Sequence, residues 1–427
     1  MCTQYSRTEY SDVQIWTDVK KEVRLNRKIL RISTADKRSC LPIIPPRKIV
    51  LQGSPKEIGQ QHGSLLSSEI KDQMKIYDAM FQSTSSLSWP EVLEIAREFQ
   101  VTIQKLTPDI YDEMVGIAEG ASVDILDIVA LNCRSEIALG RFTDGCTSLG
   151  WKMQGEKVEG KIVLAQNWDW TERVKKNLAL VEIDAAKKEK IWMVTEAGIV
   201  GKIGFNSAGV GVCLNAIRAR PTDTSKLPIH VALRICLESS SVEDAIAILE
   251  ELGGVASSQH ILIADSEGPL AMELSPLGNC FLGPGNDGFV AHTNHFIQNK
   301  LVIEPSWLKG SPVRLERANK LASELVSDVR NGLEIEDKVG RVLRERIFSD
   351  TFNSPQAICC QEDPDRPLQT RNSTLFNITM ILEAEDSSAE VVFGKPGMTE
   401  GGDIENAMDL IYHVLKCLFY YFLGIWV

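Results

Sequence analysis

The sequence predicts an α+β domain in which helices and antiparallel hairpins form separate layers. Apolar residues recur at helical spacing through the N-terminal third of the chain, whereas after Cys146 short apolar runs alternate with turn signals, as in paired strands. The 427 residues, 44% of them apolar, suffice for one large domain or two ordinary ones. Many hairpins and separate blocks of helices argue against a doubly wound parallel sheet.

The N-terminal block follows a stiff proline-rich boundary at residues 41–46 and opens with a short strand predicted over 48–52. Helical spacing of apolar residues, interrupted by prolines, then predicts helices over 58–80, 90–106 and 110–119. A further short helical turn around Asp124 and Asp127 runs into Cys133.

The block that starts at Cys146 consists mainly of predicted strands. The turn-rich segment GEKVEGK and the tetrapeptide Asn206-Ser-Ala-Gly209 each predict a hairpin between neighbouring strands. The strands are predicted at 146–153, 161–166, 178–183, 190–195, 202–205, 210–215, 260–264, 270–274, 288–292, 374–383 and 390–393. The helices are predicted at 228–238, 242–252, 313–326 and 334–346, with Ser241 capping the second of them.

Charge and cysteine content narrow the class of protein. The net charge of −12 disfavours the binding of a polyanion such as DNA, so no nucleic-acid partner is expected. The ten cysteines show no CxxC spacing, and a chain of this length needs no disulfide framework. We therefore interpret most of them, the adjacent Cys359 and Cys360 included, as reduced and packed in the core of an intracellular protein.

The two ends differ from the body. Residues 1–48 carry eleven Lys or Arg against five Asp or Glu, which indicates a basic, solvated extension. Residues 397–427 form a tail whose last eighteen residues are interrupted by charge or imidazole only at His413 and Lys416. This segment could dock on the body as a helix or act as a weak membrane anchor. Without a signal peptide or a peroxisomal ending, a cytoplasmic location is expected.

The first candidate for chemistry is Cys146 in Asp144-Gly145-Cys146-Thr147-Ser148. The flexible Gly145 allows a strained peptide, whose carbonyl the thiol of Cys146 could attack. Cleavage would free an α-amino group that titrates near pH ~8, close enough to the thiol to serve as its base. On spacing alone, a buried cysteine in a turn explains the same residues.

Three further segments carry candidate residues. In Gln166-Asn167-Trp168-Asp169-Trp170, placed at a strand end, Asp169 could hold an ammonium group or orient a base, or the segment could simply pack. In His292-Thr293-Asn294-His295, Asn294 could donate to an oxyanion. A metal site is improbable here, because no third ligand accompanies the two histidines. A Cys–His dyad of Cys146 with either histidine remains the rival interpretation.

The last segment is Thr370-Arg371-Asn372-Ser373-Thr374, which precedes a strong strand. Arg371 could be a solvated charge at the start of that strand. It could equally lower the pKa of a thiol or stabilise negative charge at the reaction centre. The residues alone leave both alternatives open.

Taken in order, the motifs of residues 49–396 resemble the fungal isopenicillin N acyltransferase family, also described as acyl-CoA:6-aminopenicillanate acyltransferases, the C45 group of N-terminal-nucleophile hydrolases. The motifs are GSPKEIGQQHG, IAEGA, LNCRSEIALG, DGCTSLG, AQNWDW, TEAGIVGKIGFNSAGVGVCLNAI, HVALRICLESS, AHTNH and TRNSTLFNI. Each motif alone is a weak signal, whereas the ordered set is highly specific.

The resemblance implies a four-layer αββα sandwich of two antiparallel sheets between helices. It also implies autocleavage between Gly145 and Cys146, with residues 49–145 in the α chain and 146–396 in the β chain. By position, Cys146 matches the nucleophile, Asp169 the carboxylate that engages the new amino terminus, and Asn294 the oxyanion donor. Arg371 matches the arginine before the TLFN strand, and Thr370 replaces the serine that precedes it in the penicillin enzyme.

The expected activity is the making or breaking of an amide through a thioester acyl-enzyme, with a role in secondary metabolism. The resemblance implies small-molecule partners, namely an acyl donor such as acyl-CoA and an amine or amide, and it implies no bound cofactor or metal. Alternatives are a purely hydrolytic cysteine amidase, an uncleaved Cys–His hydrolase, or an inactive homologue that only binds. The extension, the tail and the divergent segment 363–368 are unlike the penicillin enzyme.

Overall fold

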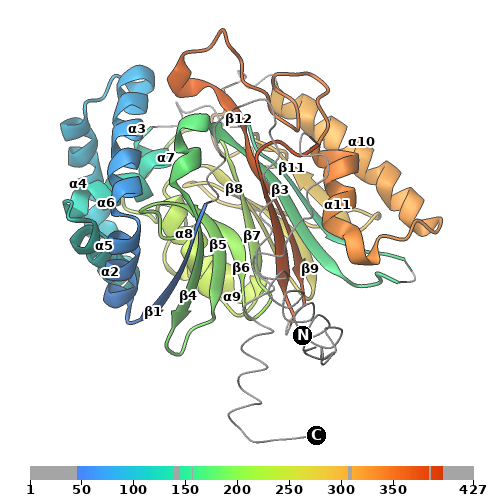
Figure 1. Ribbon diagram of the computed structural model, residues 1–427, viewed down its shortest axis with the longest axis horizontal. Coiled ribbons are helices and arrows are strands. Elements are labelled where there is room, and N and C mark those ends of the chain that lie inside the picture. The colour runs from blue at the N-terminus through green and yellow to red at the C-terminus, as the bar shows by residue number, and fades with distance from the viewer. Residues whose placement is uncertain (1–45, 139–144, 156, 306–309, 384–385, 398–427) are drawn as a thin grey trace, which may run out of the picture.

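Two β-sheets stack face to face between layers of helices, which confirms the predicted αββα arrangement (Figure 1). This computed structural model describes residues 46–138, 145–155, 157–305, 310–383 and 386–397. Nearly all of the basic extension and of the C-terminal tail lie outside these ranges. In the part of the chain that is described, no helix combines the length and the apolar character needed to cross a membrane.

The larger sheet contains eight of the described strands. In spatial order they are β1 (Arg47–Gly53), β4 (Leu178–Ala185), β5 (Ile191–Glu196), β6 (Ile203–Asn206), β7 (Gly211–Ala216), β8 (Gln259–Asp265), β9 (Gly268–Leu274) and β10 (Cys280–Leu282). All neighbours are antiparallel except β1 and β4, which pair in parallel, so the expectation of two purely antiparallel sheets is wrong at this edge. A parallel partner needs a long crossover, and the N-terminal helices lie between these two strands in the chain.

The smaller sheet contains five described strands and carries the candidate site. Their order is β11 (Phe289–His292), β2 (Thr147–Lys152), β3 (Ile162–Thr171), β12 (Asn372–Leu382) and β13 (Ser388–Phe393). All of these pairs are antiparallel. The predicted hairpin of β2 and β3 is confirmed, but β3 continues to Thr171, so Asp169 lies inside a strand and not at its end.

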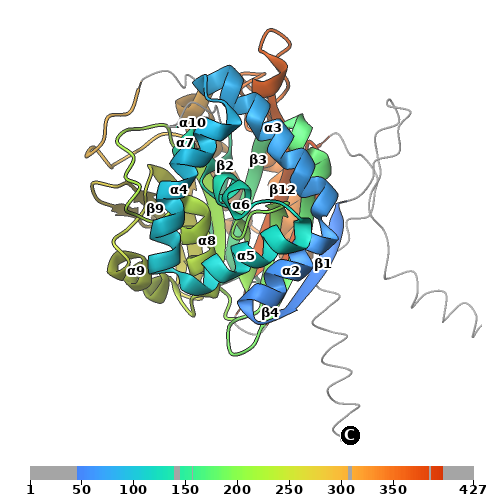
Figure 2. The same ribbon diagram turned by 90° about the vertical axis from the view of Figure 1, so that its left-hand side faces the viewer.

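Helices cover the outer face of each sheet. Figure 2 shows the N-terminal helices over the larger sheet; the helices of that side are α2 (Pro55–Leu65), α3 (Ser67–Ser85), α4 (Trp89–Leu106), α5 (Pro108–Ala121), α6 (Ile125–Asn132), α7 (Arg134–Ile137), α8 (Ile229–Glu238) and α9 (Val242–Glu251). Beside the smaller sheet lie α10 (Gly310–Arg330) and α11 (Val339–Leu343), as Figure 1 shows.

Two predicted helices are shorter or more broken than expected. The segment predicted as one helix over 58–80 is two helices, because Leu66 leaves the helical conformation with φ −116° and ψ 24°. The segment predicted over 334–346 contains only five α-helical residues in α11, followed by a π-helical turn at Arg344–Phe348. The apolar period is present in both segments, but it cannot report where the backbone interrupts a helix.

Strand β3 is buried on both faces, and this explains its apolar, non-alternating sequence. Ile162, Leu164 and Trp168 pack into the core between the two sheets, together with Cys146. On the opposite face, Val163 and Ala165 pack against residues of α10 and α11. The strand is therefore held from both sides, so a polar residue within it must find its hydrogen-bond partners inside the protein.

Helices α2 and α5 touch through their backbones at four glycines, which accounts for the motifs GSPKEIGQQHG and IAEGA. A Cβ atom on Gly59 would lie 2.0 Å from the carbonyl oxygen of Glu113, and one on Gly63 would lie 2.1 Å from that of Ile117. From the other helix, Gly116 and Gly120 approach α2 to a similar degree. No side chain longer than hydrogen fits at these positions unless the helices separate.

A buried group of charges joins the N-terminal helices to the larger sheet. Glu196 at the end of β5 accepts hydrogen bonds from Gln73 (2.7 Å) and Tyr77 (2.5 Å) of α3 and forms ion pairs with Arg134 (2.6 Å) and Lys202. Burial alone would raise the pKa of Glu196, but the cations of Arg134 and Lys202 bring it well below its ordinary value. Glu196 is thus a buried carboxylate whose negative charge is compensated by two cations and whose oxygens accept several hydrogen bonds.

The glycine contact yields a direct test. Gly59→Ala should destabilise the protein by about 2–3 kcal/mol, because the added methyl group meets backbone atoms that cannot move independently. Gly283→Ala is the matched control, since a Cβ there has no atom of the described residues within 4 Å, and its effect should stay within about 0.5 kcal/mol. The measurement is chemical denaturation of both variants. Equal stability of the two would contradict the close helix packing.

Candidate active site

The candidate site lies at one end of three neighbouring strands, β2, β3 and β12. Cys146 immediately precedes β2 and is fully buried. In the pairing of β2 with β3, Thr147 lies opposite Asn167. In the pairing of β3 with β12, Asp169 lies opposite Thr374. The sheet register therefore brings the predicted cleavage site, Asp169 and a threonine of β12 together.

Gly145 is in close contact with the carboxylate of Asp169. A Cβ atom on Gly145 would lie 3.1 Å from Oδ2 of Asp169 and 3.2 Å from its Cβ. Any side chain at position 145 would press against this carboxylate, so glycine is the residue that permits the approach. The carboxylate consequently lies beside the peptide bond between Gly145 and Cys146.

Asp169 is fully buried and is held by Thr374. The hydroxyl of Thr374 donates to Oδ1 of Asp169 at 2.6 Å and accepts a hydrogen bond from the backbone N–H of Cys360 at 2.9 Å. A short hydrogen bond from a hydroxyl to a carboxylate belongs to the stronger, charge-assisted class. Thr374 thus fixes the orientation of the carboxylate from the side of β12.

Asn294 and Cys146 share a partner that the sequence did not indicate. Arg314, in the first turns of α10, is 4% exposed. Its Nη1 donates to the carbonyl oxygen of Cys146 at 2.5 Å and to Oγ1 of Thr147 at 3.0 Å. Its Nη2 donates to Oδ1 of Asn294 at 2.8 Å. One guanidinium group therefore connects the candidate nucleophile to the candidate oxyanion donor.

The side-chain amide of Asn294 has a defined orientation. Its Oδ1 accepts from Arg314, and its Nδ2 donates to the carbonyl oxygen of Ala216 at 2.9 Å. Its backbone N–H donates to Oγ of Ser311 at 2.8 Å. An amide nitrogen carries two hydrogens, so the described bonds leave one N–H of Asn294 that can donate to a substrate.

Thr370 and Arg371 lie in the loop before β12 and contact that loop. The guanidinium group of Arg371 donates to the carbonyl oxygens of Arg366 and Pro364, both at 2.8 Å. The hydroxyl of Thr370 donates to the carbonyl oxygen of Pro367 at 3.1 Å. In this arrangement both residues shape the loop, whereas Gly145, Cys146, Asp169 and Asn294 are brought together.

The histidines near Asn294 have partners of their own. Nε2 of His292 lies 3.0 Å from Oε1 of Glu273, and its Nδ1 lies 2.8 Å from the carbonyl oxygen of Thr293. Burial would raise the pKa of Glu273, but its hydrogen bonds with His292 and backbone N–H groups lower it. Both ring nitrogens of His292 are thus already engaged with oxygen atoms of Glu273 and Thr293, which disfavours a dyad of His292 with Cys146.

His295 is a weak base in this environment. Burial lowers its pKa to about 4, with further lowering by His292 and Arg314. Its Nδ1 lies 2.8 Å from Oγ of Ser311. Among the residues that the structure describes, no three His, Cys, Asp or Glu side chains converge so as to hold a metal ion.

Five of the other described cysteines are packed in the core as apolar residues, whereas Cys280 is half-buried. Cys133, Cys213, Cys236, Cys359 and Cys360 are all buried and unbridged, and the adjacent pair forms no disulfide. Burial raises the pKa of Cys236 and of Cys359 to about 12. Such thiols stay protonated near neutral pH and are poor nucleophiles.

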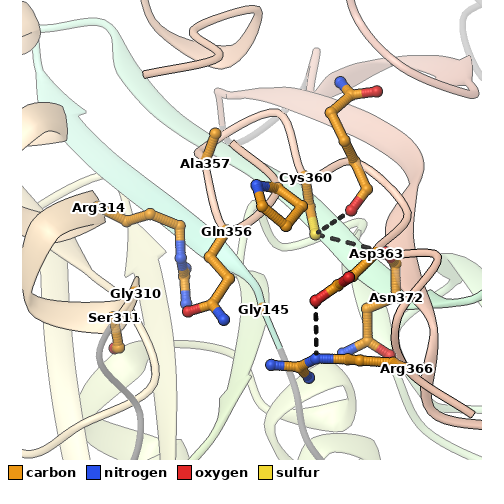
Figure 3. A pocket seen from close by; sticks show the side chains of 12 residues that line it. Gly145, Gly310, Ser311, Arg314, Gln356, Ala357, Cys360, Asp363, Arg366 and Asn372 are labelled. Atoms are coloured by element: carbon orange, nitrogen blue, oxygen red, sulfur yellow. Dashed lines mark hydrogen bonds and ion pairs between the residues drawn. The ribbon is translucent and has the colours of Figure 1, made fainter. Parts of the chain in front are cut away.

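A small pocket opens beside the cluster, as Figure 3 shows. Arg314 points into it from α10, while Cys360, Asp363 and Arg366 line another wall. Gly145 also lines the pocket, so the peptide bond that is predicted to be cut borders it. Asp363 and Arg366 belong to the segment 363–368, which is expected from its sequence to differ from the penicillin enzyme.

Comparison with known proteins shows the family of the chain. Residues 155–397 match the family described as acyl-coenzyme A:6-aminopenicillanic acid acyl-transferase. The chain is 32% identical over 350 residues to the "Acyl-coenzyme A:6-aminopenicillanic-acid-acyltransferase 40 kDa form" of Emericella nidulans, covering 82% of this chain and 92% of that protein. The chain belongs to this acyl-transferase family.

More distant relatives and solved structures are similar over smaller parts. An uncharacterised protein of Archaeoglobus fulgidus is 25% identical over 197 residues, which are 40% of this chain and 33% of that protein. Penicillin V acylase from Agrobacterium tumefaciens has a TM-score of 0.39 at 15% identity, covering 58% of this chain and 82% of that one. A conjugated bile acid hydrolase mutant from Clostridium perfringens has a TM-score of 0.38 at 13% identity, with coverages of 61% and 95%.

Sequence reasoning about this member of the acyl-transferase family missed Arg314 and Thr374 as site residues. Arg314 lies in a helical pattern rich in charged residues, where an arginine normally faces solvent. Thr374 belongs to the motif TRNSTLFNI, but only the register of β12 against β3 shows that it lies opposite Asp169. In the sequence, nothing distinguishes this threonine from any other threonine in a predicted strand.

The contact between Thr374 and Asp169 can be tested by stability. Thr374→Val should destabilise the protein by about 1–3 kcal/mol, because it leaves a buried carboxylate oxygen and the Cys360 N–H without their described partner. Thr379→Val is the matched control on the same strand, since the buried hydroxyl of Thr379 has no hydrogen-bond partner among the described residues. Chemical denaturation measures both. A loss for Thr379→Val equal to that for Thr374→Val would contradict this role.

Proposed function

We propose that this protein is made as a precursor that cuts its own Gly145–Cys146 bond and then uses Cys146 as an N-terminal nucleophile to make or break amides. Membership of the acyl-transferase family supports acyl transfer or amide hydrolysis as the activity. The observation that carries the finer proposal is the junction of Gly145 and Cys146, which lies against the buried carboxylate of Asp169.

The cleavage would proceed in two steps. The Cys146 sulfur attacks the Gly145 carbonyl, the C–N bond breaks, a thioester forms, and the thiol proton passes to the departing amine. Water then hydrolyses the thioester, giving a carboxylate on Gly145 and a free thiol and α-amino group on Cys146. The position of Asp169 beside this junction suits it to hold the new ammonium group.

Turnover would repeat the same chemistry on a small molecule. The free α-amino group of Cys146 accepts the thiol proton, and the sulfur attacks a thioester or amide carbonyl of the substrate. The remaining N–H of Asn294 donates to the developing oxyanion, a contribution of about 3–4 kcal/mol in comparable sites. An amine or water then releases the acyl group from the thioester.

The relatives and this chemistry support a substrate class. The relative in Emericella nidulans is named for acyl-coenzyme A and 6-aminopenicillanic acid. We include acyl-CoA as donor, a small amine as acceptor and a place in secondary metabolism in the proposal. Neither step requires a bound cofactor or metal ion.

The proposal predicts two chains from one. Intact mass under denaturing conditions should give two fragments of the wild type that meet at Gly145 and Cys146, and one full-length chain for Cys146→Ala, which lacks the attacking sulfur. Cys236→Ala, a buried cysteine on α8, serves as the control and should be cut like the wild type. An uncut wild-type chain, or cleavage of Cys146→Ala, would refute the N-terminal-nucleophile mechanism.

An assay of the cleaved protein then distinguishes acyl transfer from hydrolysis. We would incubate it with a panel of acyl-CoA thioesters, with and without 6-aminopenicillanic acid, and quantify free CoA, free acid and amide. An amide product that depends on the amine establishes a transferase, whereas free acid in equal amount with and without the amine establishes a hydrolase.

A further inference from the structure

We infer that Arg314 is a positioning residue that sets the distance and orientation between the Cys146 nucleophile and the Asn294 oxyanion donor. The inference rests on the proposed function for the roles of those two residues. Arg314 is on α10, apart from β2, which follows Cys146, and from β3, which carries Asp169. Its side chain extends from α10 into the pocket that Gly145 also lines (Figure 3).

The geometry suits a rigid connection. A guanidinium group is planar and presents its N–H donors in fixed directions. Nη1 is bonded to the main-chain oxygen of Cys146 and to the hydroxyl of Thr147, and Nη2 is bonded to Asn294. Because these nitrogens share one carbon, displacement of either partner changes the hydrogen bonds of the other.

Arg314 also selects the orientation of the Asn294 amide. With Oδ1 against a cation, the amide places Nδ2 on the side of Ala216. A flipped amide would set its N–H groups against the guanidinium N–H groups and lose both bonds. Arg314 therefore determines where the remaining N–H of Asn294 can meet an oxyanion, and burial of both side chains strengthens this preference.

The hydrogen bond from Arg314 to the main-chain carbonyl of Cys146 also restrains the position of Cys146 itself. After cleavage, Cys146 would be the first residue of its chain, and a terminal residue is poorly ordered unless something holds it. The bond from Arg314 to the Cys146 carbonyl restrains this residue from its C-terminal side. A displacement of about 1 Å in a reacting group can lower a rate roughly 100-fold, so the restraint is consequential.

A double-mutant cycle tests whether Arg314 acts through Asn294. Arg314→Lys keeps the positive charge and loses the planar fork, and should lower kcat by roughly 100-fold with little change in KM. Combining it with Asn294→Ala should lower kcat little further than Asn294→Ala alone, because the two residues act as one unit. Multiplicative losses in the double variant, or an unchanged kcat in Arg314→Lys, would overturn the inference.

Controls separate this role from general damage. Arg317→Lys, one turn further along α10 and ion-paired at 2.7 Å with Asp350, should keep wild-type kcat. Thr147→Val removes one described partner of Arg314 and should reduce kcat several-fold, which provides a milder variant if Arg314→Lys does not fold. Unchanged kcat in Thr147→Val would then count against the inference.

Cleavage is measured before turnover, and kcat is expressed per cleaved chain. A folded Arg314→Lys that is not cut, beside a normally cut Arg317→Lys, supports the restraint on Cys146. Addition of millimolar guanidinium to Arg314→Ala should restore part of the lost activity, and a merely structural role predicts no such rescue. An uncut wild type would instead refute the proposed function itself, so the two failures are distinguishable.

Discussion

The burial of β3 on both faces is the constraint on which the site depends. Apolar residues of this strand pack into the inter-sheet core on one side and against α10 and α11 on the other. A strand so held cannot shift its register, because a slip of one residue would exchange the two faces. Asp169 is consequently fixed opposite Thr374 and beside Gly145. The precise placement of a buried carboxylate thus follows from hydrophobic packing several residues away.

The segments before and after the predicted cut are joined by extensive noncovalent contacts. Glu196, in the part after Cys146, is bonded to Gln73, Tyr77 and Arg134, all in the part before Gly145. Strand β1 also pairs along its length with β4 of the later part. Cleavage of the chain would leave these interactions intact, so the two products should remain one folded body.

The sequence predicted most of the secondary structure, but it did not predict features that depend on backbone geometry or on tertiary pairing. Periodicity and turn signals located most helices and strands, and the ordered motifs indicated the αββα arrangement. They did not predict the break at Leu66 or the parallel edge of β1 and β4, which depend on backbone geometry and tertiary pairing. The motif glycines at positions 59 and 120 proved to be packing residues, a role that only the close approach of two helices reveals.

The same division holds for the site. Cys146, Asp169 and Asn294 were named from motifs, and the structure brings them into one cluster, but their roles remain predictions. Arg371 was matched by motif as well, and its guanidinium group contacts the carbonyls of its own loop. No local sequence pattern marked Arg314 or Thr374 as a site residue, because their roles depend on contacts with residues that are distant in the sequence. Sequence patterns identified reactive groups and overlooked the residues that hold them.

The most direct test of the central claim is to trap the acyl-enzyme. The cleaved protein would be mixed with an acyl-CoA thioester, quenched in acid and digested, and the peptides would be weighed. The mechanism predicts an added acyl mass, released by hydroxylamine, on the peptide whose first residue is Cys146. An acyl group on any other residue, or on a chain still intact at Gly145–Cys146, would contradict it.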